Sequence, residues 1–188
     1  MALSGRESEA IVSRPSKLDR IPGAMPTMPI TVRPFRESEA ATFLDIHRRS
    51  VRGLAAQHYP TEVIEAWVVP ATDENIRGFL INPDNEIRLI AELNRDPVGI
   101  GALVVANSEL RACYVVPEAA RQGVGSALVR EIERLATVHG LTHLELQASV
   151  NSEPFYAALG YYVVERGEHV LLRNGQRMAA VKMAKPLA

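Results

Sequence analysis

The sequence predicts one mixed α/β domain over residues 30–188, built on a mostly antiparallel sheet of six to seven strands. Antiparallel pairing is indicated by two turn signals, Asn94–Pro97 and Asn174–Gly175, each of which lies between two apolar runs. The size agrees, because 188 residues with 47% hydrophobic content suit a single core. A domain with an all-parallel sheet is the weaker interpretation, since hairpins do not occur in one.

Residues 1–29 differ from the rest of the chain. Prolines interrupt them at positions 15, 22, 26 and 29, and no apolar run is long enough for a signal peptide or a membrane span. We expect a disordered extension. Met25 and Met28 directly precede the first predicted strand, so a start at either of them is a second interpretation.

The elements of the domain follow from local patterns. After a first strand, Ile30–Phe35, Ser38 is predicted to cap a helix that ends near Gln57 and has His47 among the positions of its apolar stripe. Thr61 is predicted to cap a shorter helix. A further short helix is expected after Thr72. The remaining predicted elements are strands at 87–93, 98–105 and 109–116, a long helix to Gly140, a strand at 141–146, a short helix between Pro154 and Gly160, and strands at 169–173 and 176–183.

Composition excludes several classes of function. The net charge is −1 with both signs dispersed, which indicates neither nucleic-acid binding nor attraction to an anionic membrane. The single cysteine, Cys113, rules out an internal disulfide and a cysteine-based zinc site, and we expect it to be buried packing in a cytoplasmic protein. The five histidines show no pair at metal-ligand spacing, so no metal is predicted.

The segment from Cys113 to Ser126 reads as a strand, a glycine-bearing turn and the start of the long helix. The first N–H groups of a helix have no intrahelical partner, and the helix dipole adds positive charge there, so the turn is a candidate phosphate site. Gly123 and Gly125 allow a phosphate to approach the backbone, and Arg121 adds a cation. The alternative is tight strand-to-helix packing. Leu128 stands where a dinucleotide fingerprint has its third glycine.

A second segment lies about thirty residues further on, at Phe155–Tyr161. Phe155, Tyr156 and Leu159 share one face of the predicted short helix. Taken alone, an aromatic pair on such a helix indicates core packing.

Together the two segments resemble the GNAT superfamily of acetyl-CoA-dependent N-acetyltransferases. The family pattern has a strand ending in Tyr-Val-x-Pro (here Tyr114–Pro117), a Gln/Arg-x-x-Gly-x-Gly/Ala turn (Ala120–Gly125) and a Phe/Leu-Tyr-x-x-x-Gly-Phe/Tyr segment (Phe155–Tyr161). The chain departs from this pattern at Ala120, where the family usually has Gln or Arg, and at Ser149, where many relatives carry Asn. Arg121 and Asn151 are candidates to take over those contacts.

The resemblance implies a splayed sheet with helices on both faces, and transfer of an acetyl group from acetyl-CoA to a primary amine directly, in a ternary complex. It implies that Tyr156 protonates the departing sulfur and that Glu109 removes the amine proton, with ordered water as the alternative base. The backbone of Val115 would hold the pantetheine arm and polarise the thioester. The implied acetyl-CoA site comprises Val115, Arg121, Gln122, Gly123, Val124, Gly125, Ser126 and Asn151.

The resemblance places the acceptor between the first two helices and the terminal hairpin. The candidates are His58, Tyr59 and Trp67, with Glu65 and His169 as further choices. Core packing for Trp67 and a plain loop position for His58 are the alternatives. The residues do not identify the amine, and a homodimer is among the assemblies that the resemblance allows. A catalytically silent acyl-CoA-binding or sensor module is the alternative function, motivated by Ala120.

Overall fold

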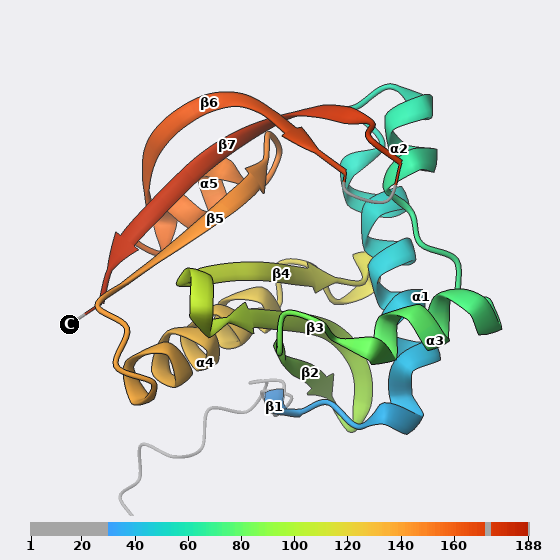
Figure 1. Cartoon of the computed structure of the whole chain (residues 1–188), viewed down its shortest axis with the longest axis horizontal. Helices are drawn as coiled ribbons and strands as arrows, with labels where there is room; N and C mark the ends of the chain where they lie inside the picture. Colours follow the sequence, from blue (N-terminus) through green and yellow to red (C-terminus); the bar gives the residue numbers. More distant parts are fainter. Residues whose placement is uncertain (1–29, 172–173, 188) are drawn as a thin grey trace, which may run out of the picture.

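The computed structural model describes residues 30–171 and 174–187, which contain a seven-stranded sheet with flanking helices (Figure 1). The strand order is β1-β2-β3-β4-β5-β7-β6, and every neighbouring pair is antiparallel except β4–β5. The predicted fold class is confirmed, whereas the expectation for residues 1–29 lies outside the described residues. The strands are β1 (Ile30–Pro34), β2 (Ile87–Leu93), β3 (Asp96–Val104), β4 (Glu109–Val115), β5 (His143–Ser149), β6 (Tyr162–Val170) and β7 (Arg177–Pro186).

The helices agree with the predicted ones, with two corrections at their starts. Ser38 caps nothing, because it lies inside a 3₁₀ turn that leads into α1. Thr61 is the first residue of α2 and Pro60 precedes it as the cap residue. Thr72 does cap a helix, since its hydroxyl accepts a hydrogen bond from the Asn75 N–H at 3.3 Å. The helices are α1 (Ala40–Ser50), continued by a π-helical turn at Val51–Ala55, then α2 (Thr61–Trp67), α3 (Asp73–Ile81), α4 (Val124–Val138) and α5 (Glu153–Ala158).

The central strands β2 and β3 are covered on both faces. Leu128 and Ile132 of α4 are fully buried against β3. On the opposite face of β3, Ile100 and Ala102 share a small cavity with Phe43 of α1. Consecutive residues of β3 are therefore buried, which explains why this strand reads as a continuous apolar run.

The C-terminal strands form a second, more exposed part of the sheet. The sequence predicts a strand only at 169–173, but β6 spans Tyr162–Val170 and all its residues except His169 are exposed. A strand without a buried face carries no alternating apolar pattern, so periodicity missed most of it. The predicted β6–β7 hairpin is present, although its connection spans residues 171–176 rather than two residues.

Candidate active site

The sheet divides between β4 and β5. Only one pair of residues, Glu109 and Glu145, is in parallel register there, with the Glu145 N–H donating to the Ser108 carbonyl oxygen at 2.9 Å. Beyond that pair the strands diverge, while β4 continues beside β3 as far as Val115 (Figure 1). The splayed sheet implied by the family resemblance is therefore present.

The divergence exposes the backbone at the end of β4. Val115 is opposite Gly99, and the next residue, Val116, donates its N–H to the Val98 carbonyl oxygen at 2.9 Å. In an antiparallel pair this pattern makes Val115 and Gly99 a non-hydrogen-bonded pair. The N–H and C=O of Val115 therefore face away from β3, towards the gap between β4 and β5.

A cavity of about 190 Å³ lies at this gap. It is enclosed by the end of α1, the end of β4, the turn before α4 and the start of α5, and we call it the backbone cavity. Four of the residues that the sequence assigned to acetyl-CoA line it: Val115, Arg121, Gly125 and Asn151. Gln122 does not, because its side chain turns back to donate to the Glu118 carbonyl oxygen at 2.8 Å.

The start of α4 presents backbone N–H groups next to this cavity. The Ala127 N–H donates to the Gly123 carbonyl oxygen at 3.0 Å, and no side chain of the described residues caps the helix. The N–H groups of Val124, Gly125 and Ser126 thus precede the first intrahelical donor, as an anion site requires. Arg121 is exposed beside them and forms no ion pair with the described residues.

The two glycines of the turn are required for different reasons. Gly123 has φ +88°, a left-handed conformation that side chains disfavour. Gly125 is needed for packing, because a Cβ there would lie 3.1 Å from Cζ of Phe155. The sequence interpretation that both glycines make room for phosphate is therefore incomplete, since Gly125 also lets α5 approach α4.

Asn151 leaves a polar atom in the cavity wall. Its Nδ2 donates to the Leu54 carbonyl oxygen at 3.2 Å, whereas its buried Oδ1 has no partner among the described residues. A buried acceptor without a donor is uncommon in folded proteins. Together with the N–H groups of α4 and the outward-facing backbone of Val115, this atom fits an elongated ligand that carries amides at one end and phosphates at the other.

Tyr156 lies behind the wall of the backbone cavity. It is 6% exposed, its ring is 4.9 Å from that of Phe155 and 5.7 Å from that of Tyr161, and it is absent from the lining. Burial, with smaller contributions from Cys113 and Tyr114, raises its pKa well above 10. The phenol is therefore protonated at neutral pH, and its ring packs against Phe155, which does line the cavity.

Cys113 is not arranged as a nucleophile. Its sulfur is 3.8 Å from the Gly125 carbonyl oxygen, and burial raises the pKa of the thiol to about 12. Because the reactive form of cysteine is the thiolate, this side chain is inert at neutral pH, as the sequence interpretation expected.

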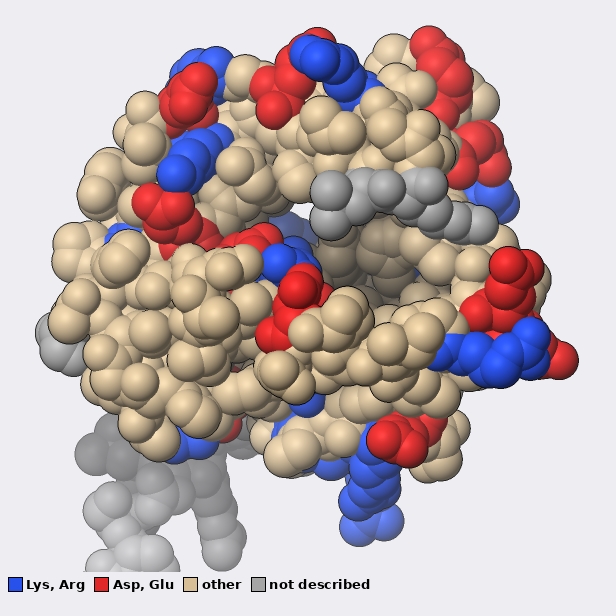
Figure 2. Space-filling model, viewed as in Figure 1, with Lys and Arg blue, Asp and Glu red and all other residues tan. Residues whose placement is uncertain are grey.

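A second cavity, of about 380 Å³, adjoins the first. The two share Trp67, Tyr114 and Ser149, and the Trp67 Nε1–H donates to the Tyr114 hydroxyl at 3.3 Å. Figure 2 shows this face of the molecule hollowed, with acidic and basic side chains together on the lower rim of the hollow. We call this space the side-chain cavity.

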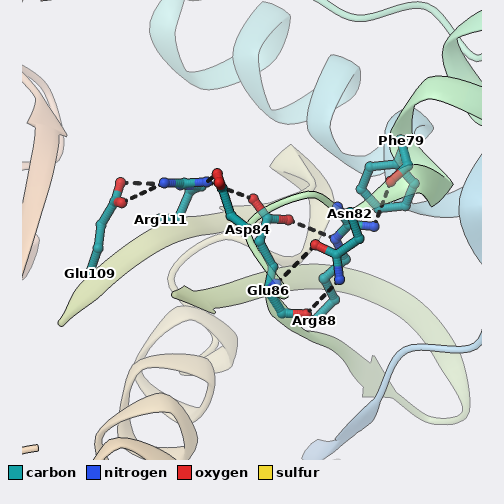
Figure 3. Close-up of polar contacts among 7 residues, drawn as sticks. All are labelled: Phe79, Asn82, Asp84, Glu86, Arg88, Glu109 and Arg111. Carbon is teal, nitrogen blue, oxygen red and sulfur yellow. Dashed lines mark hydrogen bonds and ion pairs between the residues drawn. The ribbon is translucent and has the colours of Figure 1, made fainter. Parts of the chain in front are cut away.

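Glu109 lies in the side-chain cavity as part of a charged cluster (Figure 3). Arg111 donates to both oxygens of its carboxylate, at 2.7 and 3.3 Å, and also to Asp84 and to Glu86. Arg88 joins Glu86 at 2.7 Å and stacks on the ring of Phe79. Three carboxylates thus share two guanidinium groups, which leaves one negative charge uncompensated within the cluster.

The carboxylates in turn hold Arg111. Hydrogen bonds to Glu109, Asp84 and Glu86 outweigh desolvation and raise the pKa of Arg111 above its ordinary value, so the guanidinium stays charged. The sequence interpretation named Glu109 alone and missed its partners. Asp84 and Glu86 are separated from Arg111 by more than twenty residues and share no motif with it, so no local signal was available.

His47 is a second residue of this cavity that the sequence interpretation missed. It was counted as part of the apolar stripe of α1, but it lines the side-chain cavity and its ring is 4.6 Å from that of Tyr114. Its Nδ1 is buried without a partner among the described residues, and burial lowers its pKa from 6.5 to about 4. His47 is therefore a neutral imidazole at physiological pH.

The predicted acceptor residues divide into two groups. Trp67 and His169 line the side-chain cavity. His58 is exposed in the turn after α1 and lines neither cavity, and Glu65 is exposed in an ion pair with Arg52 at 2.7 Å.

Tyr59 requires a correction. It is 8% exposed, its hydroxyl donates to the Ala179 carbonyl oxygen at 2.7 Å, and the hydroxyl accepts from the Val150 N–H at 2.8 Å. With both interactions satisfied by backbone, Tyr59 joins β7 to the end of β5. It lines neither cavity.

Comparison with known proteins decides the family. Residues 55–185 match the family model described as "Acetyltransferase (GNAT) domain". The chain belongs to the GNAT acetyltransferase family. As a member of this family it is an acyltransferase with acetyl-CoA as co-substrate, in agreement with the fit of the backbone cavity.

Individual relatives agree with this assignment. The chain is 30% identical over 111 residues to an aminoglycoside N(6')-acetyltransferase type 1 of Klebsiella aerogenes, covering 59% of this chain and 73% of the relative. Its structure is similar to that of a GCN5-related N-acetyltransferase from Rhodopseudomonas palustris, with TM-score 0.77, 30% identity, and coverage of 85% and 98% of the two chains. PaiA N-acetyltransferase of Thermoplasma acidophilum, solved with coenzyme A, has TM-score 0.68, 20% identity, and coverage of 85% and 99%.

Two features are absent from residues 30–171 and 174–187. Within these residues no helix combines the length and the apolar character needed to cross a lipid bilayer. The same residues contain no group of three or more His, Cys, Asp or Glu side chains arranged to hold a metal ion.

Proposed function

We propose that this enzyme transfers the acetyl group of acetyl-CoA to a cationic primary amine, directly and within a ternary complex. The observation that carries the proposal is the junction of the two cavities at Tyr114 and Ser149, beside the outward-facing backbone of Val115. One cavity offers backbone donors and the other offers charged side chains. The two substrates therefore meet where the two cavities adjoin.

The backbone cavity holds the acetyl-CoA. The N–H groups of Val124, Gly125 and Ser126 bind the pyrophosphate, with the guanidinium of Arg121 beside them. The backbone of Val115 and the Oδ1 of Asn151 bind the pantetheine amides. Acetyl-CoA supplies an acetyl thioester, and the Val115 N–H donates to its carbonyl oxygen as negative charge develops there.

The side-chain cavity holds the acceptor. The uncompensated negative charge of the cluster around Arg111 attracts an ammonium group, and the neutral His47 adds no opposing charge. The relative from Klebsiella aerogenes is named for an aminoglycoside, which makes such polycationic amines one class of acceptor to test.

Proton transfers complete the reaction. The acceptor ammonium loses a proton to Glu109, either directly or through ordered water, because only the neutral amine attacks. A nitrogen–carbon bond then forms as the carbon–sulfur bond breaks. Tyr156, whose proton burial retains at neutral pH, donates its hydroxyl proton to the departing sulfur, and the second proton released by the nitrogen as it becomes an amide restores the phenol.

A thiol-release assay tests this function. The full chain is incubated with acetyl-CoA and a panel of primary amines that includes aminoglycosides, polyamines, amino acids and peptides with free amino termini. We expect thiol release only with amines that carry net positive charge. Intersecting lines in initial-rate plots would support a ternary complex, whereas parallel lines would contradict direct transfer.

The silent binding module makes a different prediction in the same assay. It would bind acetyl-CoA, as measured by calorimetry, yet release no thiol with any amine of the panel. Release with neutral or anionic acceptors alone would refute the role given to the charged cluster.

A further inference from the structure

The strand β6 is the free edge of the sheet, since it follows β7 at the end of the strand order. Its residues are exposed, including Val164 at 49% and Val170 at 41%. A long exposed edge carries unpaired N–H and C=O groups and is a template for pairing with another strand. Charged residues on an edge usually discourage such pairing, so their order along β6 decides whether a partner fits.

The direction of the backbone fixes which groups are available. The Leu171 N–H donates to the Gln176 carbonyl oxygen at 2.8 Å, and Val170 is opposite Arg177. This makes Val170 and Arg177 a non-hydrogen-bonded pair, as are the pairs two and four residues earlier on β6. The N–H and C=O groups of Arg166, Glu168 and Val170 therefore face outward from the sheet.

The sequence of β6 is self-complementary about Gly167. From Val164 to Val170 the residues run apolar, acidic, basic, glycine, acidic, histidine, apolar. We propose that β6 pairs antiparallel with β6 of a second copy of this chain, with Gly167 on the two-fold axis. Arg166 of each copy then lies opposite Glu168 of the other, and Glu165 lies opposite His169.

Other antiparallel registers are unfavourable. The outward-facing groups belong to residues with even numbers, so pairing them requires a two-fold axis at a whole residue. An axis at Arg166 places two guanidinium groups opposite each other, and one at Glu168 places two carboxylates opposite each other. An axis at Gly167 places Arg166 of each copy opposite Glu168 of the other, so opposite charges face each other on both sides of the axis. Gly167 itself has no side chain that could clash where the two strands meet on the axis.

The charges of each copy extend this pairing. Within one chain, Glu153 accepts from the Arg166 NH2 group at 2.7 Å, and Arg177 donates to Glu168 at 3.0 Å. The dimer joins these two pairs end to end into a row of alternating charge, from Glu153 and Arg166 of one copy to Glu168 and Arg177 of the other. A network of this kind loses less side-chain entropy per contact than an isolated surface pair.

The dimer also reaches the acceptor. His169 lines the side-chain cavity, and the proposed register places Glu165 of the second copy beside it. Each copy thereby contributes a carboxylate at the rim of the other copy's acceptor cavity. This follows from the register alone and does not depend on the identity of the amine.

Charge exchange across the axis tests the proposal. The full chain, of 20.6 kDa, should sediment at twice that mass at micromolar concentration. Arg166→Glu alone and Glu168→Arg alone should each raise the dimer dissociation constant at least tenfold, because each places like charges opposite one another. The double variant Arg166→Glu, Glu168→Arg should restore most of the affinity.

Arg134→Glu is the matched control, since Arg134 is 59% exposed against 61% for Arg166, forms one ion pair, and lies on α4. It should leave the dimer intact. Thermal melts confirm that each variant is folded, which we expect because exposed ion pairs contribute about 1 kcal/mol or less. A monomeric parent protein, or a dimer that Arg166→Glu leaves unchanged, would overturn the proposal.

Discussion

The two cavities of the site are built in opposite ways. The backbone cavity takes its polar groups mainly from the main chain, at the end of β4 and the start of α4, within about fifteen consecutive residues. The side-chain cavity takes its polar groups from α1, the residue before β2, β4, β5 and β6, which are far apart in sequence. The first is suited to the acetyl-CoA and the second to the acceptor.

This difference separates binding of the co-substrate from recognition of the acceptor. Changes in the backbone cavity should alter acetyl-CoA affinity and leave the acceptor KM unchanged, whereas changes in the side-chain cavity should do the reverse. The residue behind the wall, Tyr156, should alter neither affinity and act on turnover alone.

The largest effect is expected for Tyr156→Phe. The ring continues to pack against Phe155 and Tyr161, so stability and acetyl-CoA affinity should change little. Without the hydroxyl the departing sulfur lacks its proton donor, and general-acid catalysis typically contributes 10²- to 10⁴-fold, or about 3–5 kcal/mol. Turnover measured by thiol release and affinity measured by calorimetry together decide the outcome. Parent-level turnover would make Tyr156 a packing residue.

A smaller effect on rate is expected for Glu109→Gln. The amide keeps the shape of the side chain but cannot take the amine proton, so kcat/KM for the acceptor should fall by about 10- to 100-fold at neutral pH. The loss should be greatest at low pH, where the amine is protonated, and should diminish as pH rises. Rates across a pH series, at saturating acetyl-CoA, provide the measurement.

Glu145→Gln is the control for Glu109→Gln. Glu145 is the register partner of Glu109 across the divided strands, but it pairs with Lys182 at 2.8 Å and lies outside the side-chain cavity. Its replacement should leave the pH profile unchanged. Equal losses in both variants would show that the effect comes from the sheet and not from a base.

The side-chain cavity should also make stability depend on pH. Burial holds the pKa of His47 at about 4, below its ordinary value of 6.5, so the unfolded chain binds a proton more readily than the folded one. The contribution of the neutral His47 to the free energy of unfolding is complete above pH 6.5. It is lost as pH falls towards 4, and the loss at pH 4 is about 2–3 kcal/mol. His47→Leu should therefore flatten the fall in Tm between pH 6.5 and 4. A variant whose Tm falls as steeply as that of the parent would contradict this.

The two cavities also differ in how far the sequence predicted them. The turn at Gly123 follows from a contiguous strand, turn and helix, whose geometry is local. The outward backbone of Val115 was expected from the family resemblance, because it depends on the divergence of β4 and β5. The cluster around Arg111 and the placement of His47 depend on which strands and helices become neighbours, and a periodic pattern cannot distinguish a cavity wall from a core. For the same reason α1 was predicted while His47 was counted among its apolar positions.

The exposed strands show the complementary limit. Strands β2 to β4 were predicted because their burial produces apolar runs, but most of β6 was missed because it has no buried face. Tyr59 was assigned to the acceptor from its position in the chain, yet its hydroxyl binds two backbone groups that only the folded chain brings together. Sequence therefore identified the residue types of the site better than their partners.

The smallest effect is expected for Gly123→Ala, which tests the backbone cavity. A left-handed conformation costs an L-residue about 1–2 kcal/mol, and the new Cβ would have open space apart from Ile30 at 3.6 Å. The strain should displace the N–H groups at the start of α4 and weaken acetyl-CoA binding by about fivefold to tenfold, without changing the acceptor KM. Gly140→Ala is the matched control, because Gly140 has φ +78°, open space around it, and a place at the opposite end of the same helix. Both variants should lose similar stability in thermal melts, while only Gly123→Ala should lose affinity in calorimetry. Unchanged affinity in a folded Gly123→Ala protein would show that the pyrophosphate does not bind at this helix start. The assignment of acetyl-CoA to the backbone cavity, and of the acceptor alone to the side-chain cavity, would then be wrong.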